Sequence, residues 1–172
     1  MIIKNYIYLT NGVAAMESAF IFPVLIILML GIIDIGQATL INTKVITASQ
    51  MASDLLTREN QLSSSDISEA QAAARAALEP YNANGQFGID IVGILYDEES
   101  APEVDWRVTS NMTASENIAS RAEGLGQEND GVIIVTVEYR YTPRFSSFVT
   151  GQRIITETAF ARGRDSAYVG YE

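Results

Sequence analysis

The strongest constraint on the fold is an apolar segment of about twenty residues near the N-terminus. From Ala14 to Ile33 the only ionisable side chain is that of Glu17, and Asp34 follows directly. A helix needs about 20 such residues to cross the roughly 30 Å of hydrocarbon in a bilayer. Buried helices of soluble proteins seldom run this long without a polar face. The apolar segment therefore predicts a single membrane-spanning helix.

A removable secretory signal peptide is the main alternative, because the residues from Phe20 to Ile33 have the length of its apolar core. Three features disagree with it. Lys4 lies far upstream, Glu17 intervenes, and no Ala-x-Ala cleavage site follows. We therefore expect the helix to stay as an anchor. Lys4 precedes it, and the positive-inside rule then places the N-terminus in the cytoplasm and the rest of the chain outside it.

Composition argues against several classes of protein. The 172 residues carry a formal net charge of −10, with 11 basic and 21 acidic side chains. Phosphate binding needs clustered Lys and Arg, so we expect no nucleic-acid partner. The chain also has no cysteine and no histidine. Thiolate nucleophiles, imidazole general bases and the usual zinc sites cannot be built without them. We therefore expect a protein that is not an enzyme and uses no metal or cofactor.

Glu17 is costly in such a segment, at about 2.5–3.5 kcal/mol on insertion scales. A chain cut after Gly12 would have a new amine at Val13, four residues before Glu17. On a helix this spacing places the amine and the carboxylate on one face, one turn apart. The amine could equally come from a neighbouring subunit. An interfacial carboxylate that reaches the headgroups without a specific partner is the remaining alternative.

Two stretches of this region resemble the start of TadE-like proteins. They are Gly-Val-Ala-Ala-Met-Glu-Ser-Ala-Phe-Ile-Phe-Pro at residues 12–23 and Leu-Gly-Ile-Ile-Asp-Ile-Gly at residues 30–36. TadE-like proteins are minor pilins or pseudopilins of the tight-adherence (Tad, Flp-type) pilus system. The resemblance implies a pilin-like α+β fold and a role in forming or assembling such a pilus, which serves adhesion and surface attachment.

The resemblance also implies roles for individual residues. Gly12 would be the last leader residue recognised by a prepilin peptidase, and Val13 the mature N-terminus. Glu17 would be the pilin-type assembly glutamate. The transmembrane positions that match the family pattern are Phe20, Pro23, Gly31 and Asp34, and Asp34 would close the span. The implied partners are the bacterial inner membrane, a prepilin peptidase, other pilin-like subunits and the Tad assembly platform.

Helical periodicity continues after the apolar segment. Residues 37–58 carry apolar side chains at three- and four-residue steps, namely Leu40, Ile41, Val45, Ala48, Met51, Ala52, Leu55 and Leu56. The predicted polar face carries Asn42, Lys44, Gln50, Ser53 and Arg58. We expect the apolar stripe to pack on the chain's own domain, with a neighbouring subunit as the alternative. A second helix is predicted after Ser65 or Asp66, which serve as caps, and Pro80 ends it.

The C-terminal half predicts four antiparallel strands. Residues 87–96 form one strand, and 104–108 alternate as its hairpin partner. The best strand follows Gly131 and is stopped by Pro143, and residues 153–162 return beside it. Its alternation predicts a core face and an opposite polar face with Thr136, Glu138 and Arg140; the core face carries Ile133, Val135, Val137, Tyr139 and Tyr141. The expected fold class is α+β: a long N-terminal transmembrane helix that continues into a stalk, with an antiparallel sheet packed on helices. We divide the chain into a leader (1–12), a transmembrane helix (13–36), a helical stalk (37–60) and an α+β head outside the cytoplasm (61–172).

Two further features have simple interpretations. The acidic cluster Asp97-Glu98-Glu99 lacks the ordered ligand spacing of a calcium loop and is expected to be a solvated loop. The C-terminal tail from Arg162, with Tyr168 and Tyr171, is expected to be a frayed terminus, and a contact tail is the alternative. The leading hypothesis is a minor pilin or pseudopilin. The alternative is a single-pass envelope binding or sensor domain that never enters a filament.

Overall fold

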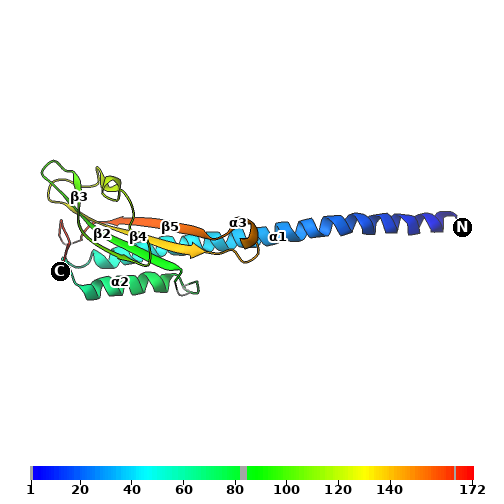
Figure 1. Cartoon of the computed structure of the whole chain (residues 1–172), viewed down its shortest axis with the longest axis horizontal. Helices are drawn as coiled ribbons and strands as arrows, with labels where there is room; N and C mark the ends of the chain where they lie inside the picture. Colours follow the sequence, from blue (N-terminus) through cyan, green and yellow to red (C-terminus); the bar gives the residue numbers. More distant parts are fainter. Residues whose placement is uncertain (1, 82–84, 165) are drawn as a thin grey trace.

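The computed structural model describes residues 2–81, 85–164 and 166–172, with side chains for 12–81, 85–147, 150–164 and 166–172. A long helix projects from the α+β head, so that the N-terminus lies far from the C-terminus (Figure 1). In chain order the elements are α1 (Ile2–Leu56), β1 (Gln61–Leu62), α2 (Ser64–Ala77), β2 (Phe87–Tyr96), β3 (Pro102–Ser110), the 3-10 turn η1 (Ser120–Ala122), β4 (Gly131–Tyr141), α3 (Ser147–Thr150), β5 (Arg153–Ala161) and β6 (Gly170–Tyr171).

The main sheet has four strands in the order β3-β2-β4-β5, and every neighbouring pair is antiparallel. The predicted fold class and the predicted strands are thereby confirmed. In the centre of the sheet, Ile91 lies opposite Val135, and Val135 lies opposite Ala159. Gly93 marks a register irregularity between β2 and β3. A Cβ at Gly93 would collide with the indole of Trp106, so the ring occupies the space that a side chain would need.

The alternation of β4 gives the sheet two different faces. Ile133, Val135, Val137, Tyr139 and Tyr141 point into the main core, as predicted, together with residues from α1 and α2. The opposite face was predicted to be polar, but it buries a second cluster. Its members are Val92, Ile94, Tyr96, Ile118, Ala122, Val132 and Ile134. The segment around η1 covers this face, and the Tyr96 hydroxyl donates to the Ala122 carbonyl at 2.6 Å.

The second half of α1 supplies the helical side of the main core. Ile41, Val45, Ala48, Ala52 and Leu56 are all at most 2% exposed. Their three- and four-residue steps define one face of the helix, which packs against α2, β4 and β5. The prediction that the apolar stripe packs on the chain's own domain is therefore confirmed.

Three details of that helical pattern were wrong. Leu40 is 58% exposed and Met51 is 44% exposed, because both lie beside the buried face rather than on it. Ser53, predicted on the polar face, is only 5% exposed. Its hydroxyl donates to the Gln50 carbonyl at 3.0 Å, which satisfies the buried oxygen within the helix itself.

The start of α2 also differs from the prediction. Ser63 is the N-cap, two residues before the earlier of the two predicted caps. The Asp66 carboxylate accepts from the Ser63 amide at 2.8 Å and from its hydroxyl at 2.6 Å. The Ser63 hydroxyl and amide hold the pKa of Asp66 below its usual range. Ala70 and Ala74 are fully buried, and their small side chains allow α2 to lie close against α1.

The C-terminal tail is ordered, which corrects the expectation of a frayed end. β6 pairs in parallel with β1, and Val169 is only 4% exposed. The Trp106 indole donates to the Val169 carbonyl at 3.2 Å. The ring of Tyr171 lies 5.4 Å from that of Trp106. The tail therefore closes the end of the head that lies farthest from the N-terminus (Figure 1).

Candidate functional site

The apolar segment is the part of α1 that leaves the head. Its large side chains are exposed on every side of the helix, with Phe20 at 75%, Phe22 at 62% and Ile27 at 66%. The most apolar window of the helix Gly12–Leu56 has a mean hydropathy of 2.6, and only 6% of that window is buried. Soluble proteins rarely expose apolar patches of this size. By length and composition this helix could span a membrane, which is consistent with a single-pass membrane protein.

Gly12, Val13 and Glu17 lie on this exposed part of the helix. The backbone is helical through all three residues, so Val13 and Glu17 occupy one face, one turn apart. Val13 is 53% exposed, and Glu17 is exposed as well. Among the residues whose side chains are described, none forms an ion pair with Glu17. The carboxylate thus lies exposed on an apolar helix without an ion-pair partner among the described side chains.

Of the predicted transmembrane positions, Phe20 and Pro23 are exposed and Gly31 is partly exposed. Pro23 lies inside α1 and lacks the amide that would donate to the Ala19 carbonyl, yet the helix continues through it. A Cβ at Gly31 would meet no heavy atom within 4 Å. Nothing within the described chain therefore requires a glycine at that position.

Asp34 lies at the point where α1 enters the head. It is only 4% exposed, although it follows directly on the exposed apolar segment. Its Oδ1 accepts from the Arg144 amide at 3.1 Å, and its Oδ2 accepts from the amides of Phe145 at 3.1 Å and Ser146 at 2.6 Å. The Tyr141 hydroxyl donates to the Asp34 backbone carbonyl at 3.2 Å.

Three consecutive backbone amides therefore converge on one carboxylate. They belong to the connection between β4 and β5, which includes α3 and lies beside α1 where the helix leaves the head (Figure 1). Amides arranged in this way form a concave site that favours a negative charge. Asp34 thus does more than end the apolar segment: it fastens the helix to the sheet connection and fixes the place at which the free helix begins.

We expect Asp34→Asn to loosen this attachment. An amide side chain offers one acceptor oxygen in place of two and carries no charge, so it cannot satisfy all three backbone donors. Hydrogen exchange at the amides of residues 144–146 should become about tenfold faster or more. Asp54→Asn is the control, since Asp54 lies on the same helix but pairs with Arg58 and Arg164 at the surface, away from residues 144–146. Unchanged exchange at residues 144–146 in Asp34→Asn would contradict the proposed attachment.

A second polar cluster lies inside the head and was not predicted. Asp90 on β2 is fully buried, and the Arg107 guanidinium on β3 donates to both of its oxygens, at 2.9 and 2.5 Å. Thr109 donates to Oδ1 at 2.7 Å, and the Ser115 amide donates to Oδ2 at 3.0 Å. Burial raises the pKa of Asp90, but the bonds from Arg107, Ser115 and Thr109 outweigh it and hold the pKa below the usual range.

The Asp90 cluster is structural in character. Arg107 also donates to the Ser115 carbonyl at 2.9 Å, so the ion pair ties β2 and β3 to the segment that covers the second face of the sheet. Both oxygens of the carboxylate are directed at neighbouring donors, and the group is closed to solvent. The sequence showed Asp90 only as a polar residue inside an apolar strand.

The acidic loop lies where a solvated loop was expected. Asp97, Glu98 and Glu99 are exposed at the turn between β2 and β3. The Asp97 carboxylate accepts from the amides of Glu99 at 2.9 Å and Ala101 at 2.8 Å, which stabilises the turn. Within the described ranges, no group of three acidic side chains converges as metal ligands would.

Comparison with known proteins bears on the N-terminal part of the chain. Residues 12–54 match the family model described as TadE-like protein. The match begins at Gly12 and covers the apolar segment, Asp34 and most of the part of α1 that packs on the head. Searches of curated proteins and of solved structures gave no match. For residues 12–54, the resemblance to TadE-like proteins, a family associated with the Tad pilus, is therefore confirmed.

Proposed function

We propose that this chain is a minor pilin or pseudopilin that takes part in building a Tad-type pilus. The observation that carries the proposal is the free apolar helix on which Glu17 has no ion-pair partner among the described residues, in the segment that matches the TadE-like family. The same exposed surface suits lipid before assembly and neighbouring apolar helices after it. In this role the protein is a structural subunit rather than an enzyme, and it needs no cofactor.

Cleavage after Gly12 by a prepilin peptidase would create the amine that Glu17 lacks. The amine of Val13 would lie about one turn from the Glu17 carboxylate, within or between subunits. An ion pair offsets part of the cost of a buried charge only when both partners are present. Pairing between subunits would set the register of one helix against the next. Its partners would then be the other pilin-like subunits and the Tad assembly platform.

The proposed location is the bacterial inner membrane, with the N-terminus in the cytoplasm and the head on the outer side of that membrane. The orientation follows from Lys4, whose side chain lies outside the described residues, and from the position of the head after the helix. From this site the subunit could pass into an extracellular pilus and contribute to adhesion.

Processing is tested by coexpressing the full chain with a prepilin peptidase. We expect the membrane-extracted product to begin at Val13, twelve residues shorter than the precursor. Gly12→Leu should block this cleavage because a bulky side chain replaces the hydrogen next to the scissile bond. Gly31→Leu is the matched control: both glycines lie on α1 and have no heavy atom within 4 Å of a built Cβ. A mature chain that starts at Met1 would exclude processing.

The competing function is a single-pass envelope binding or sensor domain that is never built into a filament. It uses the same anchor and head, so processing alone does not separate the two. Cofractionation of the chain with sheared pili or with the assembly platform separates the two functions. Recovery of the chain only in membrane fractions that contain neither pili nor the assembly platform would favour the envelope binding or sensor domain.

A further inference from the structure

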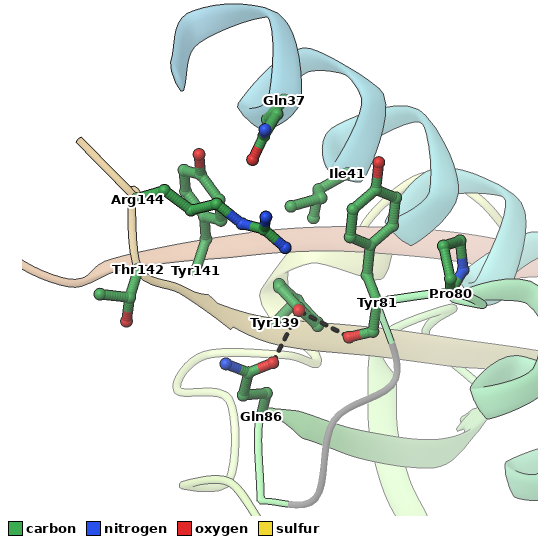
Figure 2. A pocket seen from close by; sticks show the side chains of 9 residues that line it. All are labelled: Gln37, Ile41, Pro80, Tyr81, Gln86, Tyr139, Tyr141, Thr142 and Arg144. Carbon is green, nitrogen blue, oxygen red and sulfur yellow. Dashed lines mark hydrogen bonds between the residues drawn. The ribbon is translucent and has the colours of Figure 1, made fainter. Parts of the chain in front are cut away.

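A cavity of about 240 Å³ lies in the head, next to the place where α1 emerges. Figure 2 shows it between α1, the turn after α2 and the end of β4. The residues that matter for its chemistry are Gln37, Ile41, Tyr81, Tyr139, Tyr141 and Arg144. The cavity is therefore a polar and aromatic pocket that borders the attachment of Asp34.

The pocket has one charged group among the described residues, and that group is a cation. Its described lining contains Arg144 and no acidic side chain, although the whole chain has a net charge of −10. The guanidinium of Arg144 points into the space between Ile41, Tyr81 and Tyr139 (Figure 2). Within the described part of the chain it has no carboxylate within ion-pair distance. Five other arginines form ion pairs with a carboxylate, for example Arg107 with Asp90.

The nearest carboxylate, that of Asp34, lies outside the lining and accepts from three backbone amides, and the polar groups of the lining itself offer hydrogen-bond donors. The hydroxyls of Tyr139 and Tyr141 already donate hydrogen bonds within the chain. The first donates to the Tyr81 carbonyl at 2.6 Å, and the second donates to the Asp34 carbonyl. The Tyr81 hydroxyl and the Gln37 amide have no partner among the described residues. Together with the five N–H groups of Arg144, they form a donor set suited to the oxygens of a phosphate.

The level of the pocket along α1 indicates the source of that phosphate. Gln37 lies one turn beyond Asp34, where the apolar segment ends, and Ile41 lies one turn further. At 1.5 Å per residue these side chains lie about 5–10 Å past the end of the segment. The headgroup layer of a bilayer extends roughly 5–8 Å beyond the hydrocarbon. A pocket at this height faces lipid headgroups.

We propose that this pocket binds the headgroup phosphate of an anionic phospholipid, with Arg144 as the charged ligand and Gln37 and Tyr81 as neutral donors. The inference rests on the membrane-spanning role of α1 in the proposed function. Binding would hold the head at a fixed height above the bilayer before the subunit is assembled into a pilus. The Asp34 attachment supports it, because the Arg144 amide is fixed on that carboxylate.

Native mass spectrometry of the detergent-solubilised full chain tests the proposal with short-chain phosphatidylglycerol. We expect wild type to bind one molecule and Arg144→Gln to bind it about tenfold more weakly. Tyr81→Phe, which removes one neutral donor, should weaken binding about threefold. Arg153→Gln is the matched control. Arg153 lies opposite Tyr141 on the next strand, is exposed, and does not line the cavity.

Equal weakening in Arg144→Gln and Arg153→Gln, or none in either, would overturn the proposal. Competition with inorganic phosphate distinguishes two sources of such a ligand, a lipid headgroup and free phosphate in solution. We expect it not to displace phosphatidylglycerol at equal concentration, and binding of free phosphate as tight as that of the lipid would overturn the lipid assignment. Alkaline carbonate extraction tests the anchor itself. A wild-type chain released by carbonate contradicts the proposed function too, whereas a retained chain without Arg144-dependent binding overturns only the lipid site.

Discussion

Asp90→Ala is expected to destabilise the head by about 3–5 kcal/mol, because it leaves the guanidinium of Arg107 partly buried without its partner. Arg107, Thr109 and Ser115 all lose a bond to the same carboxylate. A loss of this size is a large share of the stability of a typical domain. Thermal unfolding of the detergent-solubilised full chain, followed by circular dichroism, measures it.

Two further variants show where the effect comes from. Replacing both members of the pair, as Asp90→Leu with Arg107→Leu, should recover much of the loss, because it removes the unpaired charge as well. Asp54→Ala removes an exposed carboxylate that pairs at the surface with Arg58 and Arg164, and it should have a much smaller effect. If Asp90→Ala unfolds at the wild-type temperature, the cluster does not hold the head together.

The Asp90 cluster also predicts the response to acid. The pKa of Asp90 is lowered in the folded protein from its ordinary value of 3.8. The carboxylate therefore contributes stability above pH 3.8, and this contribution is lost as the pH falls through the lower folded value. Below about pH 4, wild type should lose stability more steeply than the double variant in which leucine replaces both Asp90 and Arg107. Parallel acid profiles of the two proteins would contradict this assignment.

Glu17→Ala is expected to abolish incorporation into pili while leaving the protein in the membrane. Removing the acid lowers the cost of inserting the helix, by about 2.5–3.5 kcal/mol on insertion scales, so the anchor itself should not suffer. In the proposed function, the variant loses the partner of the Val13 amine and with it the register between helices. The measurement is the amount of chain in sheared pili relative to the amount in membranes.

Controls for Glu17 come from the same turn of the helix. Glu17→Asp keeps the charge on a shorter side chain and should keep part of the assembly. Ser18→Ala changes the neighbouring residue, whose hydroxyl donates to the Ala14 carbonyl within the helix, and should assemble normally. Normal piliation in Glu17→Ala would refute the assembly role of the glutamate, although processing after Gly12 could still stand.

Much of the fold was predictable because it follows from local periodicity. The apolar segment, the helical steps from Ile41 to Leu56 and the alternation of β4 each repeat at the period of their own element. The positions of Pro143 and Gly131 bound the best strand in the same local way. These signals indicate which elements form, but they do not decide details that depend on distant contacts. Three consecutive serines can each begin α2, and the structure uses Ser63.

The sequence by itself determined that the chain has one exposed apolar helix with an acid inside it, and an α+β head behind it. Only the tertiary structure decided what Asp34 and Asp90 do. The Asp34 carboxylate accepts from amides that lie about 110 residues further along the chain, and Asp90 on β2 pairs with Arg107 on the neighbouring strand β3. Helix and strand periods carry no information about such pairings, which arise only when the sheet and its connections close around the side chains. The C-terminal tail is also ordered by distant contacts, because Val169 accepts from Trp106 and β6 pairs with β1.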